Sequence, residues 1–255
     1  VPAYFADCEK PETRQHLHLV VLGVTKDAAG GGDAQDEQRL LDETRKAFQI
    51  RNDANSAFAA HTIHPLTGEN ATITSVRRQF RRIKHEIERR IRQRQPNDVV
   101  IFVYQGKEVA TTGADGFVLA THDNWVAPQS NESAISWNWL SRHFNNMPGA
   151  HLVFLESLPG APNMARENLP GVHRLPNQGM LSLLRVVRNG IQRNSDLLLA
   201  VQQSASEILN EQQDAIVRLG PLREKIGRSA AQRGLAFQSD VHDALQSLVL
   251  LKQQN

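Results

Sequence analysis

The fold of this 255-residue chain is decided by two apolar runs, DVVIFVYQGKEV at residues 98–109 and HLVFLESLPG at residues 151–160. Both are short and rich in β-branched and aromatic residues, and a charged or glycine-containing segment ends each of them. Such runs are typical of strands that are buried on both faces of a parallel sheet. The run HLVVLGV at residues 18–24 has the same character.

Helical patterns separate these runs. The clearest is an apolar stripe with steps of three or four residues, formed by Ile73, Val76, Phe80, Ile83, Ile87 and Ile91. Helices are expected at residues 33–50, 73–94 and 133–147, with Thr72 or Thr74 as the cap of the second. Strands that alternate with helices predict an α/β fold: a three-layer α/β/α sandwich with a mainly parallel sheet. The expected strands of that sheet lie near residues 17–24, 57–66, 98–106 and 150–158.

The pattern changes after residue 178. Apolar residues of 181–191, 198–209 and 245–250 predict three further helices, and no strand is expected there after a weak one at 171–176. Residues 107–119 resemble a small hairpin with its turn at 113–116. The expected organisation is therefore a leader or linker at 1–16, a core at 17–178, and a helical C-terminal region at 179–255, packed on the core or forming an appendage.

The two runs at 98–109 and 151–160 resemble the motifs D-V-x-x-F-x-Y-S-G-H-G-V and x-V-x-x-L-D-A-C-H-S-G of the bacterial caspase and metacaspase family. Tyr104 and Gly106 match the first motif, and Glu156 keeps the acid of the second. Lys107 occupies the position of the general-base histidine, and Leu158 that of the nucleophilic cysteine. The resemblance covers roughly residues 17–178 and implies a caspase-like fold.

The resemblance also implies that the chemistry is lost. An aliphatic side chain cannot form a thiolate, and a lysine that is protonated at neutral pH cannot accept a proton. We therefore expect a non-enzymatic pseudo-caspase that binds a protein or peptide partner, or scaffolds a larger bacterial signalling or defence protein. No cofactor is expected. The chain begins at Val1, which predicts a domain of a longer multidomain chain.

A ligand cleft is expected at the ends of the two motif strands. In metacaspase-type relatives the acid at Glu156 helps to hold a basic substrate residue, so a basic peptide could still bind here without being cut. The interpretation that we favour is instead an ion pair of Glu156 with Lys107 or a nearby arginine. Asp123 matches the family's L-P-x-D-A segment after the hairpin and is expected to line the same cleft, together with Gln105 and Ser157.

Two other functions are open alternatives. Ser157 and Lys107 could serve as a nucleophile and base if burial lowered the lysine pKa, although strand alternation turns Ser157 away from the face of Leu158. The helix at 73–94 carries nine arginines and lysines, which could follow phosphates. However, these residues surround the helix and no aromatic residues alternate with them, which favours a solvated face over nucleic-acid binding.

The remaining residues exclude several classes of site. His16, His18, His61 and His64 lie in no recognised zinc pattern of cysteines or acids, so no metal site is expected. The single cysteine, Cys8, permits no intramolecular disulfide and fits a reducing compartment. No run of 18 apolar residues occurs, which argues against a membrane span and for a cytoplasmic protein. The formal net charge of +2 does not indicate any particular partner.

Overall fold

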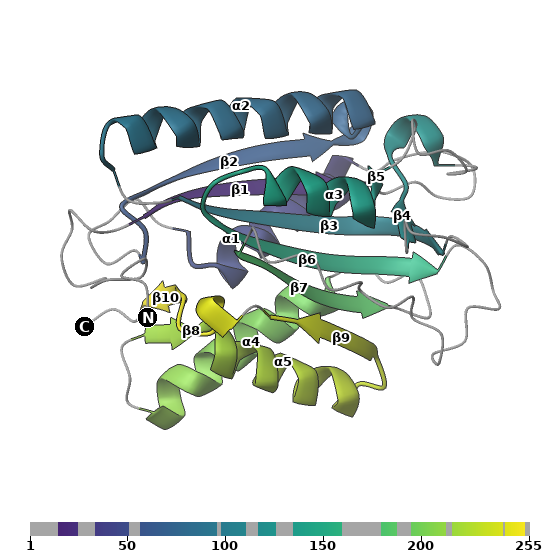
Figure 1. Cartoon of the computed structure of the whole chain (residues 1–255). Coiled ribbons are helices and arrows are strands. Elements are labelled where there is room, and N and C mark those ends of the chain that lie inside the picture. Colours follow the sequence, from purple (N-terminus) through teal and green to yellow (C-terminus); the bar gives the residue numbers. More distant parts are fainter. Residues whose placement is uncertain are drawn as a thin grey trace.

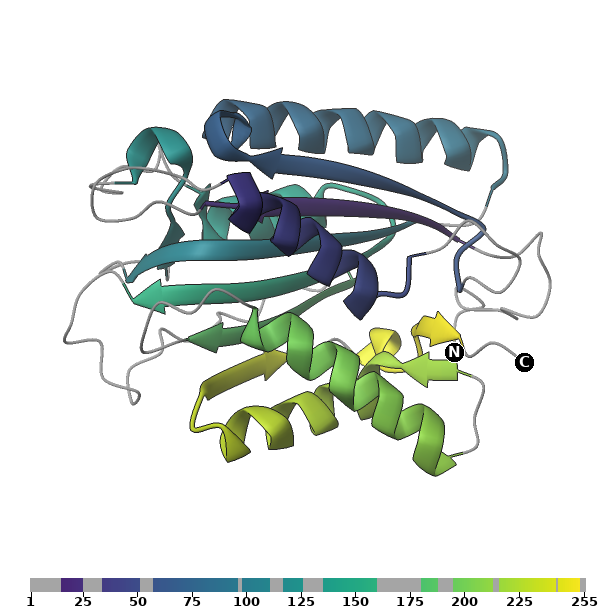
Figure 2. The same cartoon turned by 180° about the vertical axis from the view of Figure 1, so that it is seen from behind.

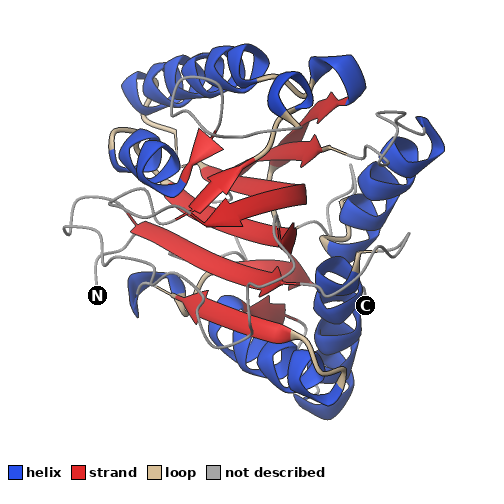
Figure 3. Ribbon diagram, turned by 90° about the vertical axis from the view of Figure 1, so that its right-hand side faces the viewer, coloured by secondary structure: helices blue, strands red, loops and turns tan. Residues whose placement is uncertain are grey.

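The structure is a computed structural model that describes residues 15–24, 34–50, 57–95, 98–110, 117–125, 135–159, 180–187, 195–212, 216–241 and 243–252. An eight-stranded mixed sheet runs through its centre, and helices cover both faces (Figures 1 and 3). The predicted three-layer α/β/α arrangement is therefore confirmed. None of the described helices is long and apolar enough to span a bilayer.

The main path of the sheet has the order β2-β1-β3-β6-β7-β9. Its first five strands are mutually parallel, and β9 joins the edge in the antiparallel direction. The four predicted parallel strands are all present. The strands of the path are β1 (His16–Gly23), β2 (Ala60–Thr67), β3 (Val99–Ala110), β6 (Ala150–Pro159), β7 (Met180–Val187) and β9 (Ala236–Asp240).

The far end of β3 extends beyond the parallel sheet into the predicted hairpin. There it pairs antiparallel with β4 (Phe117–Leu119), which in turn pairs with β5 (Ile135–Ser136). The expected turn at 113–116 lies outside the described residues. A short helix, η4 (His122–Asn124), follows β4. Just before it, the backbone nitrogen of Ala120 donates a hydrogen bond to the carbonyl oxygen of Lys107 in β3 at 2.9 Å, which holds this segment beside the end of β3.

Two helices, α2 (Ile73–Arg92) and α3 (Trp137–Asn145), cover one face of the sheet. The other face packs on α1 (Ala34–Ala47) and α4 (Asp196–Gln212), and α5 (Leu219–Gln232) lies against α4 and β9 (Figure 2). Each face has its own apolar cluster, because side chains of successive strand residues point to opposite faces.

The predicted apolar stripe explains how α2 packs on the sheet. Ile73, Val76, Phe80, Ile83 and Ile87 are buried against the sheet, whereas Ile91 is 38% exposed near the end of the helix. The hydroxyl of Thr72 caps the helix by accepting a hydrogen bond from the backbone nitrogen of Ser75 at 3.2 Å.

The C-terminal part of the chain corrects two predictions. Residues 181–187 belong to β7 and not to a helix, because a short, fully buried run has no period that distinguishes the two structures. The helix expected near 245–250 is wrong as well. That segment forms the short helix η5 (Asp243–Leu245) and the strand β10 (Val249–Lys252), which pairs with β8 (Ile216–Arg218) in a second sheet.

The predicted helix at 198–209 is confirmed as α4, whereas α5 had not been expected. The helix expected at 133–147 is shorter: α3 begins at Trp137, and Ser136 is its N-cap. The weak strand expected at 171–176 lies outside the described residues. In place of a purely helical region, the chain after residue 179 adds β7 and β9 to the main sheet.

Candidate functional site

Lys107 and Leu158 are neighbours in the register of β3 and β6. Both residues lie near the carboxyl ends of parallel strands, the edge at which open α/β sheets bind ligands. The prediction that the two positions adjoin at this edge is confirmed. The side chain of Lys107 is half-buried, and its Nζ atom donates a hydrogen bond to the carbonyl oxygen of Trp125 at 3.4 Å.

Tyr104 and Gly106, which match the first motif, fit against one another. The Tyr104 hydroxyl lies 2.7 Å from the carbonyl oxygen of Lys107 and 3.1 Å from that of Ala120. A Cβ atom on Gly106 would lie 2.5 Å from that hydroxyl, so only glycine fits here. Burial raises the pKa of Tyr104 well above its usual range, so the phenol stays protonated. The pair therefore fixes the backbone that presents Lys107.

A buried polar network lies at the same edge, on the face of the sheet that also holds Tyr104 and Phe117. The Ser157 hydroxyl donates to Oε2 of Glu108 at 2.6 Å, and Nε of Arg185 donates to the same oxygen at 3.0 Å. The Nη2 atom of Arg185 pairs with the second carboxylate oxygen, which makes the contact bidentate. Glu108 and Arg185 are 3% and 1% exposed. We call these three residues the Glu108–Ser157–Arg185 network.

Further contacts compensate the burial of the guanidinium of Arg185. Its Nη1 atom donates to Oε1 of Gln238 at 3.1 Å, and its Cζ atom lies 4.8 Å from the centre of the Phe117 ring. Burial lowers the pKa of Arg185 to about 10, which still leaves the group charged at neutral pH. A buried charge requires such partners, because desolvation alone would be costly.

The sequence interpretation missed this network. It assigned no role to Glu108 and placed Arg185 in the helix expected at 181–191. One feature of the sequence could have indicated it. Arg185 lies inside the apolar run at 183–187, and a cation that is buried in such a run requires a buried acid as its partner.

Glu156 does not face an open pocket. Its side chain is 2% exposed and accepts hydrogen bonds from the hydroxyl of Ser195 and from the backbone nitrogen of Asp196, the latter at 2.9 Å. These donors lie at the start of α4, where the helix dipole favours a negative charge. Ser195 also caps α4 by accepting from the backbone nitrogen of Leu198 at 3.0 Å. Glu156 is therefore not accessible as a recognition acid, as the favoured interpretation of an internally paired acid expected, and its carboxylate anchors α4 to β6.

Ser157 and Lys107 are directed to different partners. Ser157 is opposite Gly106 in the register, one residue away from the pair formed by Lys107 and Leu158. Its hydroxyl is 1% exposed and donates to Glu108, whereas Lys107 donates to a backbone carbonyl. This arrangement does not favour the alternative of a nucleophile and base pair.

The other two expected cleft residues lie at the edge itself. Asp123 is exposed in η4 and accepts a hydrogen bond from the Thr121 hydroxyl at 2.6 Å. Gln105 is half-buried and is opposite Glu156 in the register. The edge thus keeps Gln105 and Asp123 accessible, while the side chains of Glu156 and Ser157 are committed to internal hydrogen bonds.

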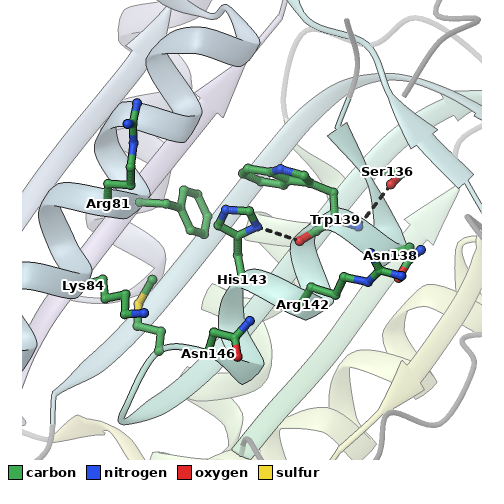
Figure 4. A pocket seen from close by; sticks show the side chains of 10 residues that line it. Arg81, Lys84, Ser136, Asn138, Trp139, Arg142, His143 and Asn146 are labelled. Atoms are coloured by element: carbon green, nitrogen blue, oxygen red, sulfur yellow. Dashed lines mark hydrogen bonds between the residues drawn. The ribbon is translucent and has the colours of Figure 1, made fainter. Parts of the chain in front are cut away.

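A separate groove of about 550 Å³ lies between α2 and α3 (Figure 4). Phe80, Trp139 and His143 form its aromatic part, with the Trp139 and His143 ring centres 3.8 Å apart. Burial lowers the pKa of His143, so its ring is neutral at pH 7. The charged residues that line the groove are all basic: Arg81, Lys84 and Arg142. We call this feature the α2–α3 groove.

Comparisons with known proteins agree with this architecture. No protein-family profile and no curated protein sequence matches the chain. Caspase-1 from Spodoptera frugiperda superposes with a TM-score of 0.52 at 11% identity, over 98% of this chain and 97% of that chain. A structure of a protein from Geobacter sulfurreducens gives 0.50 at 12% identity, over 94% and 100%. At these identities the likeness shows the fold alone, and that fold is caspase-like.

Proposed function

We propose that this chain is a catalytically inactive caspase-like domain that binds a protein partner. The observation that supports it best is the register of β3 and β6, which pairs Lys107 with Leu158 at the carboxyl edge of the sheet. A cysteine peptidase needs a thiolate and a base within hydrogen-bond reach at such an edge. These two residue types supply neither group.

The buried network adds to this argument. Arg185 neutralises Glu108, the acid that accepts the hydrogen bond of Ser157, and all three side chains are almost completely inaccessible. A serine held in this way cannot reach a peptide carbonyl. The alternative hydrolase based on Ser157 and Lys107 is therefore the weaker proposal.

The surface that we propose for the partner is the α2–α3 groove. Arg81, Lys84 and Arg142 give it a positive charge, and the ring of Trp139 offers a flat apolar surface. Aromatic and arginine side chains contribute most to protein interfaces. The groove is therefore complementary to a segment of a protein partner that carries acidic residues and an apolar anchor. In a longer bacterial signalling or defence protein, such a contact would serve as a scaffold.

Panning of a displayed peptide library tests this proposal. Peptides selected by the wild-type protein should be acidic and should carry an apolar residue, and most should lose binding to the double variant Arg81→Glu/Arg142→Glu. A matched control is Arg223→Glu/Arg228→Glu on α5, which reverses two charges away from the groove and should retain them. Peptides without acidic bias, or peptides that bind equally to both double variants, would refute the groove as the docking site.

A further double variant tests nucleic-acid binding, because α2 also exposes Arg78, Arg82 and Arg89. A labelled single-stranded oligonucleotide should bind weakly and without sequence preference. Tight binding with a steep salt dependence that is lost in Arg78→Glu/Arg82→Glu would replace the protein-binding proposal with a nucleic-acid-binding one.

A further inference from the structure

Three histidines gather beneath α2 at the β1–β2 side of the sheet. The rings of His16 and His18 stack with their centres 4.6 Å apart, and the ring of His64 lies 5.8 Å from that of His18. Each of the three residues is at most 8% exposed. His16 and His18 are in the first half of β1, so the cluster lies far from the carboxyl edge that carries Lys107 and Leu158.

Neighbouring residues orient the rings of His16 and His18. Nε2 of His18 lies 3.0 Å from Oδ2 of Asp98, whose other oxygen accepts a hydrogen bond from Nε of Arg90 at 2.9 Å. A carboxylate paired with arginine can only accept, so Nε2 of His18 donates this hydrogen bond and Nδ1 is the unengaged nitrogen of the ring. Nε2 of His16 lies 2.9 Å from the Thr62 hydroxyl, which leaves Nδ1 as its unengaged nitrogen too.

The unengaged nitrogens are buried. Nδ1 of His16 and Nδ1 of His18 have no hydrogen-bond partner among the described residues. Buried polar atoms without partners are rare in native proteins, and a bound ion is one of their ordinary explanations. Glu86 of α2 completes the group, since one ligand atom from each of His16, His18 and Glu86 lies within 4.8 Å of the others.

We propose that His16, His18 and Glu86 bind a divalent transition-metal ion of the Zn²⁺ type and thereby join β1 to α2. Two imidazoles and one carboxylate suit such ions, whereas Ca²⁺ and Mg²⁺ require a shell of oxygen ligands. The hydrogen bond of His18 to Asp98 is the outer contact that commonly orients a metal-binding histidine. In a tetrahedral site, ligand atoms at 2.0–2.2 Å from the ion lie roughly 3.3–3.6 Å apart. The three ligand atoms, which now lie within 4.8 Å of one another, would therefore move closer by about 1 Å through side-chain rotation when the ion binds.

A zinc pattern is absent from the sequence because Glu86 lies on another element. Only the packing of α2 against the sheet brings Glu86 close to His16 and His18 of β1.

Calorimetric titration of the tag-free full chain with Zn²⁺ tests the site. We expect one ion per chain, with affinity reduced at least about tenfold in Glu86→Gln and in His16→Gln. Glu86 is only half-buried, so its variant tests the site even if a histidine variant fails to fold. The matched control is His85→Gln, the exposed neighbour on α2, and Cys8→Ser controls for binding to the thiol; both should bind as the wild type does.

Zn²⁺ should also raise the thermal unfolding midpoint, by roughly 5–10 °C at a hundredfold excess over Kd, and Mg²⁺ should not. Absence of Zn²⁺ binding would overturn the proposal. So would wild-type affinity in both Glu86→Gln and His16→Gln, or a loss of binding in Cys8→Ser.

Discussion

Glu108 of β3 and Arg185 of β7 form a buried, bidentate ion pair across β6, the strand that lies between theirs. Ser157 of β6 donates to the same carboxylate, so one acid connects three neighbouring strands. The pair lies at the carboxyl edge of the sheet, next to the positions of Lys107 and Leu158. Its contribution can be measured directly.

The first prediction concerns this pair. Arg185→Met leaves the Glu108 carboxylate buried without a counter-charge and should lower the free energy of unfolding by about 3–5 kcal/mol. The double variant Glu108→Gln/Arg185→Met should recover a large part of that loss, because no unpaired charge remains. Urea denaturation measures both. Arg45→Met removes an exposed ion pair with Asp42 and should cost less than about 1 kcal/mol. Strict additivity in the double variant would contradict the proposed coupling.

The second prediction concerns Glu156. Its carboxylate holds the start of α4, so Glu156→Gln should lower the free energy of unfolding by about 1–3 kcal/mol, the range for a hydrogen bond to a charged group. The same variant should bind groove-selected peptides like the wild type. Glu211→Gln, which changes an exposed acid at the other end of α4, is the control for stability. Reduced peptide binding without loss of stability would contradict this prediction and would support a role of Glu156 in peptide recognition.

The third prediction concerns activity. Peptides with Arg, Lys or Asp before the scissile bond should not be cleaved, with or without calcium, because the paired edge positions hold Lys107 and Leu158. Fluorogenic substrates measure this in an overnight assay. Cleavage that survives Cys8→Ala but disappears in Ser157→Ala would instead establish a serine hydrolase.

The fourth prediction concerns pH. Burial lowers the pKa of His151 from 6.5 to about 3, so the folded protein keeps this ring neutral while the unfolded chain protonates it below pH 6.5. The unfolded state therefore binds more protons, and stability should fall as the pH is lowered from about 6.5 toward 3. His151→Gln should flatten that decline. Urea midpoints between pH 7 and pH 4 measure it, and the exposed His85→Gln should leave the slope unchanged.

The strands of the sheet centre could be predicted because parallel strands buried on both faces are continuous apolar runs. The same reasoning led to a wrong prediction at residues 180–187, where a helix was expected and the strand β7 is found. A run of that length suits a helix or a strand equally, and only pairing with β6 decides between them. The stripe of α2 was correctly predicted because its six apolar residues repeat over several turns, and no strand produces such a period.

The site was harder to predict than the fold. The pairing of Lys107 with Leu158 could be predicted, because each residue lies at the end of a motif strand and neighbouring parallel strands end at the same edge of the sheet. The partners of Glu156 and Glu108 did not follow, because Ser195 and Arg185 reach them from segments far along the chain. Such pairings depend on which strand lies beside β6 in the sheet. Local sequence patterns carry no information about the order of the strands.

The order of the strands has a consequence for synthesis on the ribosome. β6 is complete at Pro159, but β7, which covers its second side, begins only at Met180. Until β7 emerges, a nascent chain with β1, β2, β3 and β6 in place exposes the backbone edge of a long apolar strand. Such an edge can pair with another chain. We therefore expect chains truncated between β6 and β7 to aggregate, whereas the full-length chain protects that edge with β7 and the short antiparallel strand β9.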